Sequence, residues 1–422
     1  MNGSAAQRTI DAIWRIESAK LIAGLTRMVR DIGLAEDLAQ DALVIALERW
    51  PVSGIPDNPG AWLMTTAKRR AIDFIRRSKV REQKYEEFGQ GNEMYTEDDI
   101  DMAMDGEVGD DLLRLIFMTC HPALSQEARV ALTLRLLGGL TTDEIAHAFL
   151  IAESTIAQRI VRAKRTLSSM RVAFEVPAGE ELKERLSTVL EVIYLMFNEG
   201  YTATSGGSWI RPLLCQEALR LGRVLAEIAT GEPEVHGLVA LMEIQSSRFK
   251  TRVSAAGEPI LLMDQNRGLW DQLLIRRGLA ALERAQKLGR PLGPYALQAA
   301  IAACHAKART AAETDWARIA ALYEALSRVM PSPVVELNRA VAIAMAFGPA
   351  FGLQIVDELT SVPSLKDYHL LPSVRGDLLV KMGRSGEARG EFERAASLTR
   401  NVRERELMLK RAAECTSDEH VD

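Results

Sequence analysis

The chain is short of aromatic residues, of cysteines and of long apolar runs, and each shortage excludes a kind of protein. Aromatic residues make up 5% of the 422 residues, and the four cysteines, Cys120, Cys215, Cys304 and Cys415, are widely spaced without a CxxC pair. Such spacing is typical of reduced cytosolic thiols. No apolar run approaches the roughly 18 residues of a membrane span, and the N-terminal sequence lacks the apolar core of a signal peptide. We therefore expect a cytoplasmic protein with no membrane partner.

Alternating β-branched residues are also scarce, whereas Ala, Leu, Glu and Arg dominate the sequence. This composition predicts an all-α fold. Hydrophobic residues make up 47% of the chain and charged residues 26%, which is the balance of a soluble globular protein, and the length predicts two to four domains. The pairs Cys120–His121 and Cys304–His305 are adjacent residues, which suit tetrahedral metal binding poorly, so we expect neither a metal site nor a cofactor.

Charge is distributed unevenly along a chain whose formal net charge is −5. Residues 60–85 contain eight basic and two acidic residues, and residues 153–171 contain five basic residues and one acidic residue. Between them, residues 86–111 contain eleven acidic residues and neither Lys nor Arg. For a protein that binds nucleic acid, the distribution of charge matters more than its sum. The sequence therefore predicts two basic modules joined by an acidic tether.

The segment that follows Gly139 predicts a helix-turn-helix. Thr141 or Thr142 is placed to cap its first helix, and Glu144 is placed to accept hydrogen bonds from the free backbone N–H groups. Apolar residues at helical spacing form the faces on which the two helices are expected to pack. These residues are Ile145, Ala146, Phe149, Ile156 and Ile160.

The second helix of this motif is expected to begin at Glu153 or Ser154 and to carry a polar, basic face. Its outward side chains are Ser154, Thr155, Gln158, Arg159 and Arg162. Hydroxyl, amide and guanidinium groups on one helix face suit the major groove of DNA, where base edges and phosphates offer acceptors. An ordinary helical hairpin with a solvated basic face is the alternative.

Helical periodicity also predicts the elements that precede this motif. Residues 5–30, 34–50 and 59–80 fit amphipathic helices, and Ile16 is among the apolar positions of the first. Two further helices are predicted between residues 112 and 139.

Three segments, in order along the chain, resemble a known family. They are AEDLAQDALVIALERW (Ala35–Trp50), AWLMTTAKRRAIDFIRR (Ala61–Arg77) and GLTTDEIAHAFLIAESTIAQRIVRAKRTL (Gly139–Leu167). Together they resemble a sigma-70 family RNA polymerase sigma factor of the extracytoplasmic-function type. The resemblance implies that the first segment docks on the polymerase clamp, the second reads and melts the −10 promoter element, and the third reads the −35 element. The long helical extension resembles that of the subgroup with a C-terminal tetratricopeptide-like domain.

This resemblance implies two small helical sigma domains, an acidic linker and a large α-helical extension. The expected boundaries are 1–80 for sigma region 2, 81–111 for the linker, 112–172 for the region 4 helix-turn-helix domain and 176–422 for the extension, which is expected to be tetratricopeptide-like in about 295–415. The expected partners are core RNA polymerase and promoter DNA, with a regulatory protein or ligand as a further candidate at the extension. The protein is not expected to be an enzyme.

The resemblance also assigns roles to polar residues of the three segments. The expected contacts of the −35 element are Ser154, Thr155, Gln158, Arg159, Arg162 and Lys164. The expected contacts of the −10 element are Arg69, Arg70, Asp73, Arg76 and Arg77. The expected contacts of polymerase are Asp37, Gln40, Asp41 and Glu48. Solvated helix charge is the alternative for each set.

The sequence departs from the family pattern at three positions. Arg69 stands where many members have Asn, Leu150 stands where Gly is common in the turn, and Ala152 stands where a Ser cap is common. Ser154 is then the candidate cap of the second helix. These departures leave the −10 base preference and the geometry of the turn open. Trp62 is expected in the core, with a surface for base stacking as the alternative.

The linker and the extension carry further hypotheses. The family's linker threads a basic channel of polymerase, so the resemblance implies this role for the acidic residues Glu97, Asp98, Asp99 and Asp101. A plain solubilising linker is the alternative. The spacing of a tetratricopeptide helix pair is met by Gly376, Leu379, Gly383, Ala388, Phe392 and Ala395. A generic helical bundle is the alternative there.

Two polar clusters of the extension, residues 242–252 and 264–272, lie in apolar sequence. Their charged residues are expected to pair with one another, with a ligand pocket or a face that grips the sigma domains as the alternative. These residues are Glu243, Arg248, Asp264, Arg267 and Asp271. Besides a sigma factor, two functions stay open: a DNA-binding regulator on a helical-repeat scaffold that does not dock on polymerase, and an enzyme within residues 176–422.

Overall fold

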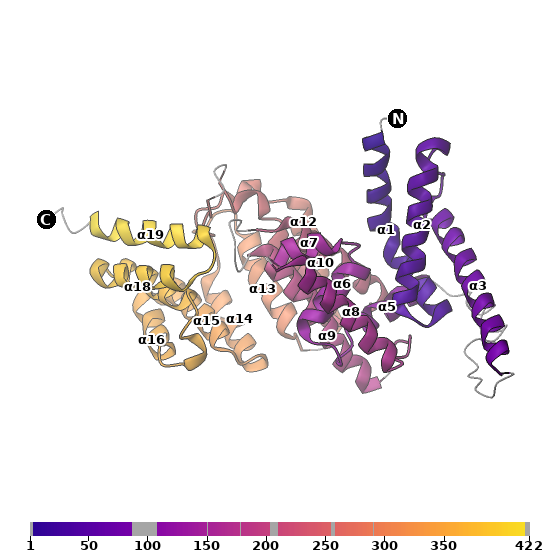
Figure 1. Cartoon of the computed structure of the whole chain (residues 1–422). Coiled ribbons are helices and arrows are strands. Elements are labelled where there is room, and N and C mark those ends of the chain that lie inside the picture. Colours follow the sequence, from indigo (N-terminus) through magenta and orange to yellow (C-terminus); the bar gives the residue numbers. More distant parts are fainter. Residues whose placement is uncertain are drawn as a thin grey trace. The chain divides into compact units, whose positions relative to one another are not determined.

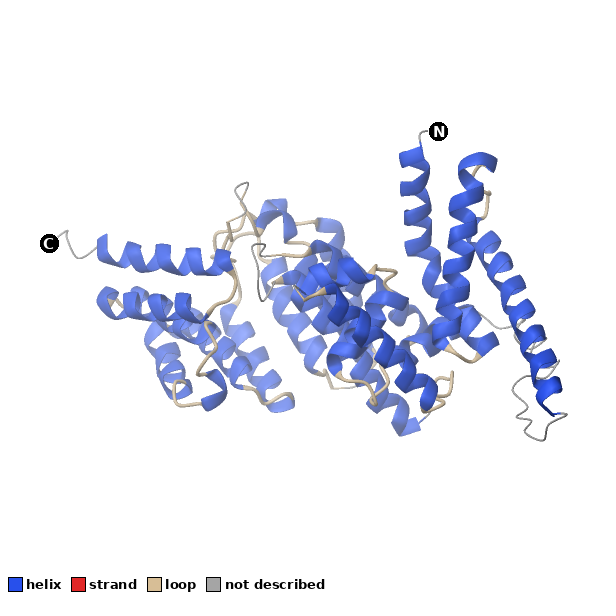
Figure 2. Cartoon of the chain, in the orientation of Figure 1, coloured by secondary structure: helices blue, strands red, loops and turns tan. Residues whose placement is uncertain are grey.

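Helices form most of the described chain, as the composition predicts. The computed structural model describes residues 3–86, 108–149, 151–177, 179–202, 210–254, 258–289 and 291–417. Within these ranges Figure 2 shows helices joined by loops, and extended pairing is limited to an isolated antiparallel bridge between Val253 and Pro259. None of the described helices combines the length and the apolar character that a membrane crossing requires. The expected all-α fold is confirmed.

The chain divides into two compact units, Met1–Leu195 and Met196–Asp422. Figure 1 labels their helices along the sequence. The first unit contains the three segments that resemble a sigma factor. Its helices are α1 (Gly3–Val29), α2 (Ile32–Ser53), α3 (Pro59–Glu86), α5 (Val108–Thr119), α6 (Gln126–Leu136), α7 (Thr142–Phe149) and α8 (Glu153–Ser169). The boundary between the units falls within the sequence of α9 (Gly179–Tyr201).

Helix α1 packs against α2, α3 and α5. Its residues Ile10, Leu21 and Leu25 are buried, whereas Ile16, which was expected among the apolar positions, is 60% exposed. An α-helix turns by about 100° per residue, so Ile16 faces the side opposite to Leu25, nine positions further along. Ile16 therefore lies outside the buried face of this amphipathic helix, unlike Ile10, Leu21 and Leu25.

The helices reach into both ends of the expected linker. Helix α3 continues to Glu86 and α5 begins at Val108, so the expected helix end at residue 80 and the expected restart at residue 112 are wrong. Basic, acidic and amide side chains alternate over residues 81–86, and such residues favour a helix even without an apolar face. The acidic residues Glu97, Asp98, Asp99 and Asp101 lie outside the described residues.

One buried carboxylate joins helices from both sigma-like halves of the first unit. Glu36 of α2 is 3% exposed. It accepts a hydrogen bond from Nε of Arg135 in α6 at 2.7 Å and forms an ion pair with Lys164 of α8. Asp31, which caps the N-terminus of α2, also accepts a hydrogen bond from the Ser168 hydroxyl of α8 at 2.8 Å. The N-terminal end of α2 therefore holds the C-terminal half of α8.

The second unit is an array of helices. Helix α11 packs against α10, α12 and α13 and is buried over most of its length. From α13 onward each helix packs against the next one in sequence. The helices after α9 are α10 (Pro212–Ile228), α11 (Pro233–Ser246), η1 (Phe249–Thr251), η2 (Arg267–Leu269), α12 (Gln272–Lys287), α13 (Pro294–Lys307), α14 (Trp316–Val329), α15 (Pro333–Phe347), α16 (Pro349–Leu359), η3 (Pro363–Leu365), α17 (Leu370–Lys381), α18 (Ser385–Leu398) and α19 (Val402–Ser417).

The pair of α17 and α18 shows the small-against-large packing that the sequence predicts. Gly383 lies in the turn between them with φ +74°, a conformation that glycine adopts without strain. Gly376 faces the ring of Phe392 so closely that a Cβ atom there would lie 2.8 Å from Phe392 Cε1. Phe392 itself is 1% exposed. This contact fits a tetratricopeptide-like array of helix pairs.

The buried position of Glu36 leads to a stability prediction. The substitution Glu36→Gln removes the negative charge that compensates Arg135 and Lys164, so we expect the free energy of unfolding of the first unit to fall by about 1–3 kcal/mol. Asp41→Asn is the matched control, because it breaks the ion pair of Asp41 with Arg70, in which both side chains are about half exposed. The resulting decrease in the free energy of unfolding is expected to stay below about 1 kcal/mol. Urea unfolding measures both values, and equal losses would contradict the structural role of Glu36.

Candidate nucleic-acid interface

The helix-turn-helix begins with a reciprocal cap on α7. The Thr141 hydroxyl accepts a hydrogen bond from the backbone N–H of Glu144 at 3.1 Å, and the Glu144 carboxylate accepts one from the backbone N–H of Thr141 at 2.8 Å. This is the capping box that the sequence predicts, with Thr141 as the cap. Ile145 of α7 and Ile156 of α8 are both buried, and the two helices pack against one another. These contacts fix which face of α8 is left outside.

Helix α8 begins at Glu153, one of the two predicted starts. Ala152 occupies the capping position without a side-chain hydrogen bond, and Ser154 lies inside the helix. The expectation that Ser154 caps α8 is therefore wrong, because the helix starts one residue before it. The Ser154 side chain is exposed instead.

The polar face of α8 is largely as predicted. Ser154, Thr155, Gln158 and Arg162 are exposed, and Arg159 is half-buried. Their positions lie within about two turns of one helix, so the hydroxyl, amide and guanidinium groups share a continuous surface. Such a surface has the dimensions and the donors that the major groove accepts.

Lys164 lies apart from this face. Its ammonium group forms an ion pair with the buried carboxylate of Glu36, and its side chain is 19% exposed. In this conformation the Lys164 ammonium group is engaged by the Glu36 carboxylate. The expected phosphate contact by Lys164 would compete with this ion pair.

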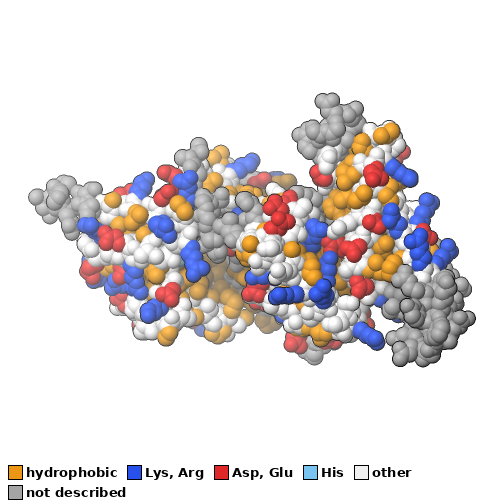
Figure 3. Space-filling view, viewed as in Figure 1, with side chains coloured by type: hydrophobic (Ala, Val, Ile, Leu, Met, Phe, Trp, Pro, Cys, Tyr) orange, Lys and Arg blue, Asp and Glu red, His pale blue; other side chains and the backbone are white. Residues whose placement is uncertain are grey.

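Helix α3 carries the second basic surface. Leu63, Ala67 and Ile75 are buried on one side of the helix. The opposite side exposes the predicted residues Arg69, Arg70, Asp73, Arg76 and Arg77. Figure 3 shows Lys and Arg side chains along the visible edge of this helix. The helix thus presents a row of cations, as its spacing predicts.

The predicted polymerase contacts lie along α2. Asp37, Asp41 and Glu48 are exposed, whereas Gln40 is half-buried and donates its amide to the Glu36 carboxylate at 2.8 Å. Partial loss of water raises the pKa of the Asp37 carboxyl above its usual value, although the nearby Lys164 ammonium acts in the opposite direction. The carboxylates therefore line an accessible face beside the Glu36 contact.

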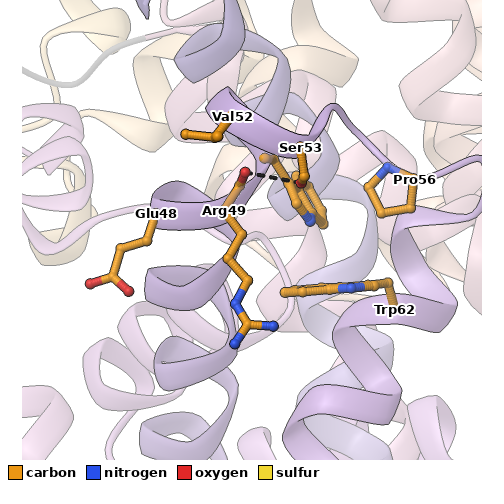
Figure 4. Close-up of a pocket in the computed structure, with 7 residues that line it drawn as sticks. Glu48, Arg49, Val52, Ser53, Pro56 and Trp62 are labelled. Atoms are coloured by element: carbon orange, nitrogen blue, oxygen red, sulfur yellow. Dashed lines mark hydrogen bonds between the residues drawn. The ribbon is translucent and has the colours of Figure 1, made fainter.

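A pocket of about 400 Å³ lies where α2 ends and α3 begins (Figure 4). The Trp62 ring forms one wall, and its centroid lies 5.2 Å from that of the buried Trp50 at an interplanar angle of 65°. Trp62 is half-buried rather than fully in the core. The lining residues are Glu48, Arg49, Trp50, Val52, Ser53, Pro56 and Trp62. Two tryptophans that flank a proline-containing loop are the sequence signal at this place, and they do not by themselves predict a pocket.

Three family models match successive parts of the chain. Sigma-70 region 2 matches residues 17–81, sigma-70 region 4 matches residues 114–167, and a family of unknown function, DUF6596, matches residues 185–286. The first two matches cover α2 with α3 and α7 with α8, which carry the predicted polymerase and DNA surfaces.

Similar proteins cover either the whole chain or its first part. An uncharacterized protein of Rhizobium meliloti (strain 1021) is 41% identical over 91% of this chain and 90% of its own length. The probable ECF RNA polymerase sigma factor SigI of Mycobacterium tuberculosis is 31% identical over 44% of this chain and 67% of its own length. SigK of Mycobacterium ulcerans, an ECF sigma factor, is 31% identical over 34% of this chain and 75% of its own length.

A solved TPR domain covers 91% of this chain and 99% of its own length at 11% identity, but its TM-score of 0.23 is too low to indicate a common fold. The family assignment therefore comes from the two sigma-70 regions and the sigma-factor relatives. On these grounds, the chain belongs to the extracytoplasmic-function (ECF) family of sigma-70 RNA polymerase sigma factors.

Proposed function

We propose that the protein binds core RNA polymerase and directs it to specific promoters. The observation that carries this proposal is the presence of two exposed basic helix surfaces, on α3 and α8, within the segments that match sigma-70 regions 2 and 4. The protein contributes recognition and strand opening, and polymerase supplies the chemistry. Asp37, Gln40, Asp41 and Glu48 of α2 are the proposed polymerase contacts.

The exposed face of α8 is the proposed reader of the −35 element. Gln158 and Arg159 have the amide and guanidinium groups that form paired hydrogen bonds with base edges. Arg162 extends the same face toward the phosphate backbone. Lys164 joins these contacts after it leaves Glu36, so DNA binding and breakage of this ion pair are coupled.

Helix α3 and the Trp62 pocket are the proposed −10 site. Arg69, Arg70, Arg76 and Arg77 are the proposed phosphate or base contacts, with Asp73 on the same row. The pocket is large enough for one planar group, and its indole wall offers a stacking surface. An unpaired promoter base is therefore its proposed occupant.

The extension is proposed to regulate or support the sigma domains. Its first helix already contributes to the core of the first unit, because Arg185 of α9 donates to the Phe117 carbonyl at 2.9 Å and lies 5.7 Å from the Phe117 ring centroid. A truncation before Arg185 would remove this contact.

Binding to polymerase separates a sigma factor from a DNA-binding scaffold that acts alone. We expect the full chain to co-purify with core RNA polymerase, and Glu48→Lys to weaken that binding by roughly tenfold because the carboxylate is exposed on the proposed docking face. Glu358→Lys, on the exposed side of α16, is the matched charge change and should leave binding unaltered. A folded chain that does not bind core polymerase would favour the scaffold.

Base reading and phosphate binding by α8 predict different promoter dependence. Gln158→Ala should reduce the binding free energy by about 1–3 kcal/mol on a promoter that has the base read by Gln158. It should have little effect on a promoter in which that one base is replaced. Lys164→Ala should weaken binding to all −35 variants alike and reduce the salt dependence by about one phosphate contact. Binding of the polymerase complex to a set of promoter variants measures both, and the same pattern for both substitutions would refute the division of roles.

The Trp62 pocket predicts a defect in strand opening. Trp62→Ala should reduce the open-complex population by the equivalent of about 1–3 kcal/mol, because the stacking surface is lost, while Trp62→Phe retains most of it. Permanganate reactivity of unpaired thymines reports the opening, and urea unfolding shows whether each variant remains folded. Equal opening by a folded Trp62→Ala variant and the unmodified protein would rule out stacking in this pocket.

A further inference from the structure

Two buried or half-buried arginines surround one tryptophan in the second unit. Arg248 follows α11, and Arg267 begins η2. Their guanidinium carbons lie 5.4 Å and 5.3 Å from the ring centroid of Trp270, which is 3% exposed. Two positive charges are therefore held next to the same apolar side chain.

The acidic residues of the two polar clusters do not compensate these charges. The Glu243 carboxylate accepts from Arg223 at 2.8 Å, Asp271 caps the N-terminus of α12, and Asp264 is exposed. Within the described parts of the chain, no carboxylate forms an ion pair with Arg248 or Arg267. The expectation that the charged residues of these clusters pair with one another is therefore wrong.

Neutral groups satisfy part of the hydrogen bonding of the two arginines. Arg248 donates to the amide oxygens of Gln265 and Gln245 at 3.1 Å and 3.0 Å. Arg267 donates to the backbone carbonyls of His305 and Ala308 at 2.9 Å and 3.3 Å and to the Thr314 hydroxyl at 2.8 Å, while its Nε atom is buried without an acceptor among the described residues. Oxygen dipoles of this kind bind the N–H groups but leave the net positive charge in place.

Further nitrogen atoms around the arginines also have no partner among the described residues. They are Nε1 of Trp270 and Nδ1 of His305, both buried. Burial, and then the charges of Arg248 and Arg267, lowers the pKa of His305 to about 4, so the imidazole is neutral at pH 7. The nearby Glu313 acts on Arg267 only from an exposed position.

Arg252, in the same polar cluster as Arg248, is a third buried cation. Arg252 is 3% exposed, with its guanidinium carbon 3.5 Å from the ring centroid of Tyr201, and it donates to the Thr202 hydroxyl at 3.1 Å. Burial lowers the pKa of Arg252, and the charge of Arg248 acts in the same direction. Three guanidinium groups are therefore concentrated in this region, and Arg248 and Arg267 are the two that lie beside Trp270.

We propose that Arg248 and Arg267, together with the ring nitrogens of Trp270 and His305, bind the phosphate group of a small anionic ligand. A guanidinium fork matches the oxygen geometry of phosphate, and bound phosphate supplies the direct ion-pair partner that no described carboxylate provides. Arg248, Arg267 and Trp270 lie within the part that matches the family of unknown function. The inference concerns the second unit and does not depend on binding to polymerase.

The test uses the full chain and measures Trp fluorescence and thermal unfolding during titration with inorganic phosphate, with adenosine monophosphate and with succinate. Sodium chloride at the same ionic strength is the control for general screening. We expect saturable binding of phosphate or of the nucleotide. Arg248→Gln should weaken it by roughly tenfold to a hundredfold, because one charged donor is lost. Arg276→Gln, an exposed arginine of α12, should bind as the unmodified chain does.

Binding of free phosphate or of the nucleotide alone supports the proposal and identifies the source of the phosphate group. Three results would overturn the proposal. They are saturable binding of succinate alone, no saturable binding of any of the ligands, and binding of phosphate by Arg248→Gln that is as tight as binding by the unmodified chain. Arg248→Lys keeps the charge without the fork and should bind phosphate more weakly than the unmodified chain. This second variant decides the question if Arg248→Gln does not fold, and unaltered phosphate binding by a folded Arg248→Lys variant would also overturn the proposal.

Discussion

A charge that leaves water must meet an opposite charge or a set of hydrogen bonds, because its desolvation costs several kcal/mol. In the first unit this constraint is met at Glu36, whose buried carboxylate is shared by Arg135 and Lys164. The contact determines how α2, α6 and α8 are held together. In the second unit the same constraint is only partly met, since Arg248 and Arg267 have neutral hydrogen-bond partners.

The Glu36 contact also relates the three proposed binding surfaces to one another. It joins the helix proposed to dock on polymerase to the helix proposed to read the −35 element. The proposed contact of Lys164 with DNA phosphate requires the ion pair of Lys164 with Glu36 to break. In the proposed function Glu36 competes with DNA phosphate for Lys164, so the closed arrangement lowers the number of cations available to DNA. Binding to polymerase through α2 would then favour the form in which α8 is open to DNA.

Local features of this fold were predictable from sequence, and tertiary features mostly were not. The capping box of Thr141 and Glu144 and the start of α8 depend on residues a few positions apart, so spacing alone identifies them. The exposed row on α3 follows in the same way from helical periodicity. The exposure of Ile16 was not predictable, because one apolar residue outside the main stripe does not reveal which face is covered. The partner of Lys164 lies 128 positions away at Glu36, and no local pattern indicates it.

The site residues show the same division. Exposure of Ser154, Thr155, Gln158 and Arg162 could be predicted, since it depends on the face of one helix. The Trp62 pocket could not, because it is formed by the end of α2, a loop and the start of α3. In the extension, the composition of the two polar clusters indicated an unusual site, but the distribution of partners required the structure. Glu243 turned out to pair with Arg223, which lies outside both clusters.

The most direct test of the central claim is transcription in vitro with core RNA polymerase and the full chain on a library of genomic fragments. The account predicts discrete start sites that share two upstream elements, at positions that α3 and α8 can reach together. Core polymerase alone should not use these sites. A folded protein that leaves the start sites of core polymerase unaltered on every fragment would contradict the assignment of α3 and α8 as promoter-reading helices.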